Sequence, residues 1–257
     1  MSAPIMPGAD AWSFEGSSTT GLLALHGFTG NPSSVRLLAE AASSAGYHVE
    51  LPRLAGHGTV VDDMLTTTWA DWSADADAAF ERLAARVDRV VVSGLSMGGS
   101  LALSTALAHP DTAALVCINP ATVPQGADVL EMVEEMVDEG IDVAPGIGSD
   151  IADPDATETA YEGTPLRPLL SLQHDGLAPM TDRFGELTMP LTLLTSRQDH
   201  VVSPSDSEHL AGTYGGSVEH VWLERSFHVA TKDYERDICV ERTLAVLAAV
   251  TPEAATA

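Results

Sequence analysis

The residues with the clearest potential for chemistry surround Ser96. The run Gly94-Leu95-Ser96-Met97-Gly98 fits the pattern G-x-S-x-G, which alone is a weak signal. Here an apolar run at 90–92 precedes it and a helical pattern at 97–108 follows it. In a strand–turn–helix setting, a serine is held on a tight turn with its hydroxyl above the sheet, and the glycines leave room for that turn. The pattern therefore predicts a nucleophilic serine rather than an ordinary turn.

A serine hydroxyl needs a neighbouring base, and the base needs a group that orients it. In chains that present a serine in this setting, an acid and then a histidine follow. Asp199 comes after the apolar run 191–194, and His228 comes after the run 218–223. Loops at the carboxyl ends of parallel strands meet in one crevice. We therefore predict that His228 is the base and that Asp199 orients it.

The other histidines have less suitable positions. His26 follows the first apolar run and is expected to support that loop, and His57 is expected to hold its own turn. His200 is next to the acid but precedes the last strand. The remaining five are interpreted as ordinary surface or core residues: His48, His109, His174, His209 and His220.

Acyl transfer also needs donors for the oxyanion of the tetrahedral intermediate. The N–H of Met97, directly after the serine, is one candidate. The loop His26-Gly27-Phe28-Thr29-Gly30 follows the first apolar run, and Phe28 N–H is the second. Each such donor contributes roughly 3 kcal/mol to lowering the barrier.

These residues require a scaffold of alternating strands and helices, which the apolar patterning predicts. Strand-like runs are continuous rather than alternating, which favours a sheet covered on both faces. Helices between strands favour parallel crossovers. The expected fold class is thus a doubly wound, mostly parallel α/β sheet. Strands are expected at 21–25, 47–51, 90–92, 114–118, 191–194 and 218–223, and helices at 34–45, 69–87, 97–108 and 236–250.

One interval departs from this rhythm, because no strand is expected between Asn119 and Pro190. An acidic amphipathic helix is predicted at 127–139, followed by a Gly/Pro/Asp-rich loop and a leucine-rich stretch. We predict that residues 1–120 and 187–257 form the sheet core and that residues 121–186 form a helical cap over the carboxyl edge. A small lobe with its own core is compatible with this reading.

Composition limits the partners. The 257 residues carry 37 acidic and 12 basic side chains, a formal net charge of −25. Such a surface repels nucleic acid and anionic lipid and disfavours a strongly anionic substrate. No secretory signal or membrane-spanning run is evident, so a cytoplasmic protein is expected. Cys117 and Cys239 lie in apolar stretches and are interpreted as buried free thiols.

Several segments together resemble the alpha/beta-hydrolase superfamily, and within it bacterial monoacylglycerol lipases and related small carboxylesterases. They extend from about residue 20 to about residue 245, although residues 122–139 depart from the family pattern. The resembling segments are Leu25-His-Gly-Phe-Thr-Gly30, Leu51-Pro-Arg-Leu-Ala-Gly-His-Gly-Thr59, Thr67-Thr-Trp-Ala-Asp-Trp72, Gly94-Leu-Ser-Met-Gly-Gly99, Ile147-Gly-Ser-Asp150, Ala160-Tyr-Glu-Gly-Thr-Pro165, Asp199-His-Val-Val202 and His228-Val-Ala-Thr231.

The resemblance implies hydrolysis of monoacylglycerols to glycerol and fatty acid through an acyl-enzyme, with no metal or organic cofactor. It implies the same triad and the same oxyanion donors, Phe28 and Met97. It further implies that Glu158 accepts hydrogen bonds from the glycerol hydroxyls and that Ile147 lines the same pocket. A neutral diol head group needs a hydrogen-bond acceptor, and an acyl chain needs an apolar tunnel. The cap could supply that tunnel. At most a transient contact between the cap and a lipid surface is expected.

Three alternatives remain open from the sequence. A broad short-to-medium-chain carboxylesterase would use the same triad on simple esters. A thioesterase would use it on thioesters. A hydrolase fold without catalysis could instead serve as a receptor for small molecules. A covalent serine probe separates the last from the others, and relative rates on matched substrates separate the enzymes.

Overall fold

The computed structural model describes residues 3–146 and 148–252, and their strands form one large sheet. The order is β1-β3-β2-β4-β5-β8-β9. Only β1 is antiparallel to its neighbour, which confirms the predicted fold class. The strands are β1 (Trp12–Phe14), β2 (Thr20–Leu25), β3 (His48–Leu51), β4 (Arg89–Leu95), β5 (Ala114–Ile118), β8 (Leu191–Ser196) and β9 (Val218–Leu223).

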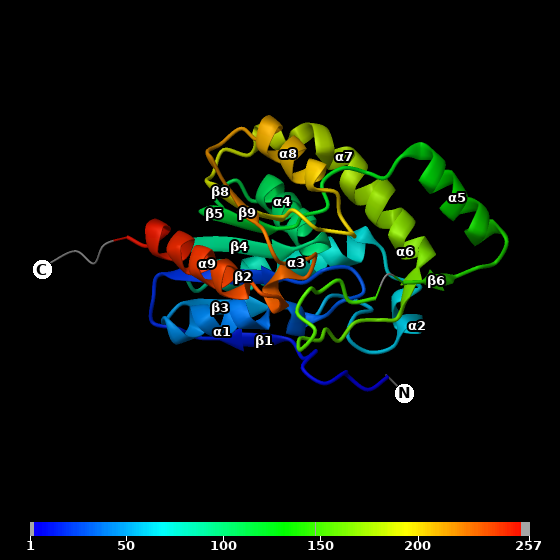
Figure 1. Cartoon of the computed structure of the whole chain (residues 1–257). Coiled ribbons are helices and arrows are strands. Elements are labelled where there is room, and N and C mark those ends of the chain that lie inside the picture. The colour runs from blue at the N-terminus through cyan, green and yellow to red at the C-terminus, as the bar shows by residue number, and fades with distance from the viewer. Residues whose placement is uncertain (1–2, 147, 253–257) are drawn as a thin grey trace, which may run out of the picture.

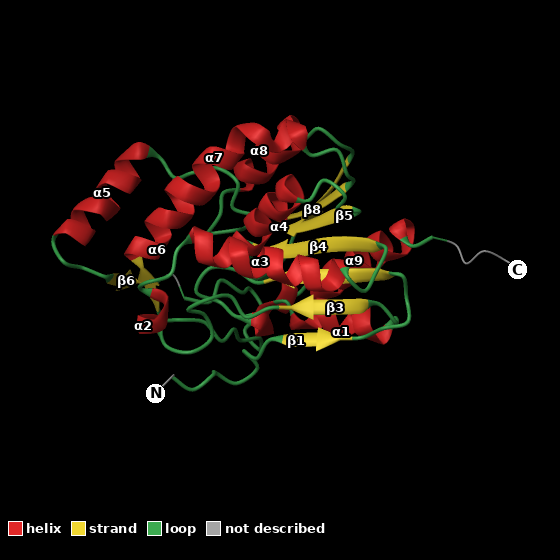
Figure 2. Ribbon diagram, turned by 180° about the vertical axis from the view of Figure 1, so that it is seen from behind, coloured by secondary structure: helices red, strands yellow, loops and turns green. Residues whose placement is uncertain are grey.

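Helices cover both faces of this sheet (Figures 1 and 2). One apolar cluster joins the sheet to α1 and α9, and a second joins its other face to α3, α4 and α8. With both faces covered, β2, β5 and β8 are buried along their whole length, which explains their continuous apolar sequences. The helices are α1 (Arg36–Ser44), α3 (Trp69–Ala84), α4 (Met97–Ala108), α8 (Pro204–Thr213) and α9 (Arg236–Val250), and a short α2 (Val61–Met64) lies in a loop.

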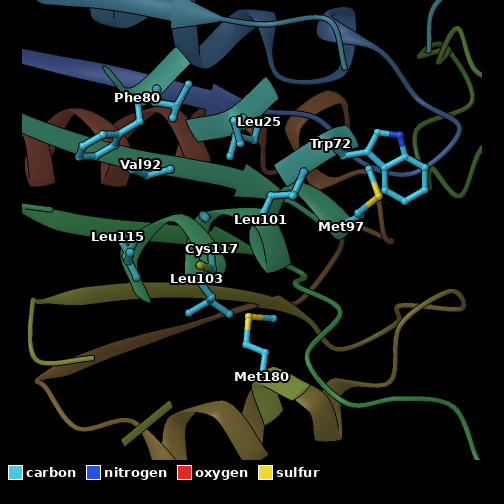
Figure 3. Packing of buried hydrophobic residues seen from close by; sticks show 14 of the residues in the cluster. Leu25, Trp72, Phe80, Val92, Met97, Leu101, Leu103, Leu115, Cys117 and Met180 are labelled. Carbon is cyan, nitrogen blue, oxygen red and sulfur yellow. The ribbon is translucent and has the colours of Figure 1, made fainter. Parts of the chain in front are cut away.

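Helix α4 lies at the centre of the larger cluster. Its side chains meet those of α3 and the neighbouring strands (Figure 3). Leu101 and Leu103, on different sides of α4, are both fully buried. A helix that is apolar on all sides belongs in the interior, and this one fixes the position of the turn that precedes it.

Residues 121–186, which we call the inserted segment, lie between β5 and β8. Its helix α5 stands away from the sheet (Figure 1) and packs on α6 through a small cluster of Val133, Val137 and Leu166. Its later residues belong to the main core. The helical elements are α5 (Ala127–Asp138), α6 (Leu166–Ser171), a π-helix (Leu172–Leu177), α7 (Ala178–Met180) and a 3-10 helix (Thr181–Glu186).

The expectation that no strand lies between Asn119 and Pro190 is wrong. Strands β6 (Val143–Pro145) and β7 (Gly163–Pro165) form a separate antiparallel pair in the inserted segment. Each spans three residues, too few to show the alternation by which a half-buried strand is recognised. Strand β1 was not predicted for the same reason. Both pairings arise because tertiary structure brings two short extended stretches together.

Cys117 and Cys239 are buried free thiols, which confirms their interpretation. Burial raises the pKa of each to about 12. Among the helices of the described residues, none combines the length and apolar character needed to cross a bilayer.

Candidate active site

Ser96 occupies the turn between β4 and α4. Its backbone has a positive φ, 57° with ψ −122°, a conformation in which residues other than glycine are uncommon. The turn is tight enough to need its glycines. A β-carbon at Gly94 would lie 2.0 Å from Gly98 O, and one at Gly98 would lie 2.2 Å from Leu25 O. Local crowding thus explains the spacing of the glycine–serine pattern.

Ser96 and His228 line the same cavity, which has a volume of about 370 Å³. Its wall combines the carboxyl edge of the sheet with the inserted segment, which contributes Glu158, Tyr161 and Leu172. The fold thus places Ser96 and His228, two of the residues predicted to form the triad, at one cavity, although 132 positions separate them in the sequence.

His228 is hydrogen-bonded to the third predicted member, Asp199. His228 Nδ1 lies 2.7 Å from Asp199 Oδ2, and their side chains are 9% and 2% exposed. Asp199 Oδ1 accepts the N–H groups of Val201 and Val202, each at 2.8 Å. The carboxylate is therefore fixed at both oxygens. An ionised carboxylate accepts but does not donate, so it holds the imidazole with Nδ1 protonated and Nε2 able to accept a proton.

The serine hydroxyl lies beside the loop that follows β2. A β-carbon at Gly27 would lie 3.7 Å from Ser96 Oγ. Within residues 3–146 and 148–252, the hydrogen bonds do not include one between Ser96 Oγ and the His228 ring. Such contacts are often long without substrate and tighten in the Michaelis complex.

Of the predicted oxyanion donors, Phe28 lines the same cavity and Met97 directly follows Ser96. Met97 N–H is at the N-terminus of α4, where helix amides lack intrahelical acceptors. Phe28 lines the cavity from the loop after β2. Among the described residues, neither amide donates to a protein acceptor in the turns and loops. Both groups can therefore face an anionic oxygen.

His26 supports this loop, as the sequence predicts. Its Nδ1 is 3.0 Å from Gly27 O, and its Nε2 accepts the N–H of Leu54 at 3.2 Å. The ring must then be neutral, with the proton on Nδ1. Because the Gly27–Phe28 peptide is planar and trans, holding the Gly27 carbonyl on one side directs Phe28 N–H to the other. Burial, with His57 nearby, lowers the pKa of His26 well below its ordinary value.

His57 is buried against His26 and Trp72, and its Nδ1 is 2.9 Å from Ala55 O. Burial lowers its pKa from 6.5 to about 4. The unfolded chain takes up a proton near 6.5 and the folded chain only near 4, so stability is lost as the pH falls between these values. We expect His57 alone to account for roughly 3 kcal/mol of that loss.

Denaturant unfolding between pH 7 and 4 measures this contribution. His57→Gln should show a shallower fall in the free energy of unfolding than the parent chain. His174→Gln, at a half-exposed histidine, is the matched control and should keep the parent's slope. A parent and a His57→Gln variant with parallel pH curves would contradict the assignment.

Glu158 reaches the cavity from the inserted segment. A β-carbon at Gly30 would lie 3.5 Å from Glu158 Oε1, which places the carboxyl group beside the oxyanion loop. Burial raises the pKa of Glu158, and the nearby His228 and Lys232 act in the opposite direction. Lys232 Nζ donates to Thr157 O at 3.3 Å. Ile147, also predicted to line this pocket, lies outside the described residues.

Two residues with extensive contacts at this site were not singled out from the sequence as functional. Asn119 follows β5 and donates through Nδ2 to His228 O at 2.8 Å, while its Oδ1 accepts Ser196 N–H at 2.7 Å. Asp150 binds the loops of both Asp199 and His228. Asn119 starts the loop after β5 and Asp150 lies within the loop between β6 and β7, and polar residues are common at such places.

The known proteins that are similar in sequence to this chain include a lipase and a carboxylesterase. The model of the alpha/beta hydrolase family matches residues 22–235. A thermostable monoacylglycerol lipase of Bacillus sp. (strain H-257) is 39% identical over 94% of this chain and 95% of its own. A carboxylesterase of Bacillus subtilis (strain 168) is 26% identical over 88% of this chain and 91% of its own.

Solved structures agree with these sequence comparisons. One from a study of two metagenome-derived lipolytic enzymes superposes with a TM-score of 0.89 at 38% identity, covering 96% of this chain and all of that one. The monoacylglycerol lipase of Paleococcus ferrophilus superposes with a TM-score of 0.73 at 14% identity, over 93% of this chain and 99% of that one. The second likeness concerns the fold alone.

Proposed function

The chain belongs to the alpha/beta hydrolase family, and from this premise we propose that Ser96, Asp199 and His228 are the catalytic triad of an ester hydrolase that acts on monoacylglycerols. Hydrolysis of carboxylic esters agrees with its lipase and carboxylesterase relatives. The observation that carries the proposal is the buried 2.7 Å contact of His228 with Asp199, at the cavity that Ser96 lines.

The reaction follows from these contacts. Ser96 Oγ attacks the ester carbonyl while His228 Nε2 takes its proton, and Asp199 stabilises the imidazolium that forms. The N–H groups of Phe28 and Met97 bind the oxyanion. His228 then returns the proton to the departing glycerol oxygen, and the acyl group stays on Ser96. Water, activated by His228 in the same way, hydrolyses this acyl-enzyme and releases the fatty acid.

The inserted segment serves as a cap in this proposal, with residues 1–120 and 187–257 as the hydrolase core. Leu169 and Leu172 give the cavity an apolar wall suited to an acyl chain. On α5, Val129 lines the cavity mouth and is 42% exposed, and Met132 is 54% exposed. Acidic neighbours surround these two side chains, so transient contact with a neutral lipid surface fits better than contact with an anionic one.

A product assay tests the function. Monoacylglycerols of several chain lengths should yield glycerol and free fatty acid in equal amounts, faster than di- or triacylglycerols. The alternative, a general carboxylesterase, has support from the Bacillus subtilis relative. If the protein is a general carboxylesterase, a simple ester with the same acyl chain should be cleaved as fast as the monoacylglycerol.

A substitution of Glu158 should affect the hydrolysis of monoacylglycerols and of simple esters differently. A carboxylate that accepts hydrogen bonds from a diol contributes about 1.5–3 kcal/mol, so Glu158→Gln should lower kcat/KM for a monoacylglycerol by about 10- to 100-fold. Turnover of an aryl ester with the same acyl chain should stay near the parent value, since that leaving group has no diol to bind.

The control is Glu162→Gln, which changes an exposed glutamate in the same segment and should leave both substrates unaffected. Equal losses on the two substrates for Glu158→Gln would remove the glycerol-binding role.

A further inference from the structure

Asp150 connects the inserted segment to both loops that carry the acid and the base. Its Oδ2 accepts the N–H of His200 and the N–H of His228, each at 3.1 Å. Its Oδ1 is 2.8 Å from His200 Nδ1. His200 directly follows Asp199, so one carboxylate holds the main chain of the two residues that must meet.

The main chain of His228 is held at both ends. Asp150 takes its N–H, and Asn119 Nδ2 donates to its carbonyl oxygen at 2.8 Å. Asn119 directly follows β5 of the sheet, and Asp150 belongs to the inserted segment. The Cα of His228, and with it the position of the imidazole, is therefore fixed from both sides, by a residue next to the sheet and by a residue of the inserted segment.

The contact is part of a wider attachment of residues 150–153 to the His228 loop. Asp150 O accepts the N–H of Val229 at 3.1 Å. The fully buried carboxylate of Asp233 accepts the N–H groups of Ala152 at 2.7 Å and Phe227 at 2.8 Å. Because several hydrogen bonds hold residues 150–153 against the His228 loop, the position of Asp150 beside His228 is fixed.

The Asp150 side chain is only 9% exposed. His228 is 7% exposed, so water has little access to its N–H, and a side chain without an acceptor at position 150 would leave that N–H unpaired in a partly dry environment. The His228 loop would then relax toward other partners. Displacement of a catalytic group by 1 Å can cost about 100-fold in rate.

We propose that Asp150 is a positioning residue through which the inserted segment sets the geometry of the Asp199–His228 pair, an inference that rests on the proposed function. Among the described residues, its side-chain hydrogen bonds go to the N–H groups of His200 and His228 and to His200 Nδ1, and not to Ser96 Oγ or His228 Nε2. It holds His228 N–H and the residue after Asp199, so that a shift of the inserted segment reaches the base directly.

The test compares Asp150→Ala and Asp150→Leu with Asp150→Asn in the full chain. Alanine and leucine remove the acceptors, and leucine also fills the space if the alanine variant does not fold. Both should lower kcat on a short aryl ester by about 10- to 100-fold with KM within a factor of about two. Asparagine can turn its oxygen to the two N–H groups and its NH₂ to the other tautomer of His200, and should keep kcat near the parent value.

Proton NMR gives a readout that loss of stability alone does not move. The far-downfield signal of the His228 Nδ1–H bound to Asp199 should shift or broaden in Asp150→Ala and Asp150→Leu and persist in Asp150→Asn. Asp155→Ala, at an exposed aspartate of the same segment, is the control and should match the parent in both measurements.

Parent-like kcat and NMR signals in the alanine and leucine variants would overturn the positioning role. So would an asparagine variant as slow as the alanine variant, since charge rather than placement would then be responsible. Ser96→Ala, assayed alongside, separates the two proposals. If Ser96→Ala is inactive while Asp150→Ala is unaffected, only the role of Asp150 fails, whereas an active Ser96→Ala refutes the triad itself.

Discussion

Replacing Ser96 with alanine should lower kcat by roughly 10⁶. The hydroxyl oxygen is the atom that forms the acyl-enzyme, and no other side chain can take its place on the β4–α4 turn. Steady-state assay on an aryl ester measures this loss. Intact-protein mass spectrometry after treatment with a fluorophosphonate should give one adduct on the parent chain and none on the variant.

Ser104→Ala is the matched control, because it makes the same change about two helix turns further along α4, at a half-buried residue outside this cavity. It should keep both activity and labelling. Circular dichroism should show that Ser96→Ala folds, since alanine and serine meet the same steric cost at this positive φ. Retention of more than a few per cent of the activity by Ser96→Ala would exclude it as the nucleophile.

Asp199→Asn should lower kcat by roughly 10⁴, the loss known for this change in a serine protease triad. Asp199 Oδ1 already accepts two backbone N–H groups, from Val201 and Val202. An asparagine will keep its oxygen there, so its NH₂ must face His228. The ring then has to accept at Nδ1 and carries its proton on Nε2, where it cannot take one from Ser96.

The loss should be in kcat rather than in KM, because the binding cavity is unchanged, and labelling by the fluorophosphonate should slow in parallel. Asp182→Asn, at an exposed aspartate far along the inserted segment, controls for the change of charge. Turnover by Asp199→Asn within tenfold of the parent would mean that another group orients the histidine.

Much of the scaffold was predictable because its signals are local. Helices Met97–Ala108 and Arg236–Val250 and strands Ala114–Ile118 and Val218–Leu223 have the bounds that the sequence predicts. In the interior both partners of a contact are apolar, and their spacing along the chain is enough to recognise a strand or helix. Gly94 and Gly98 likewise lie within two residues of Ser96, so the turn that requires them can be recognised from the local sequence.

The remaining features depend on segments that meet only in the folded chain. The β6–β7 pair was missed because its strands carry no periodicity, and β1 for the same reason. Asp150 lies 78 residues from His228. It ends the segment Ile147-Gly-Ser-Asp150, which resembles the family pattern, but no local feature of that segment predicts a contact with the His228 loop.

The sequence by itself thus determined the sheet, the turn that presents Ser96, and the strand ends at which an acid and a histidine should be sought. Tertiary structure decided how the main chain of that histidine is held, by Asn119 at its carbonyl oxygen and by Asp150 at its N–H. The physical reason is that apolar periodicity is written along the chain. A hydrogen bond between a side chain and a distant backbone group depends only on where folding brings them.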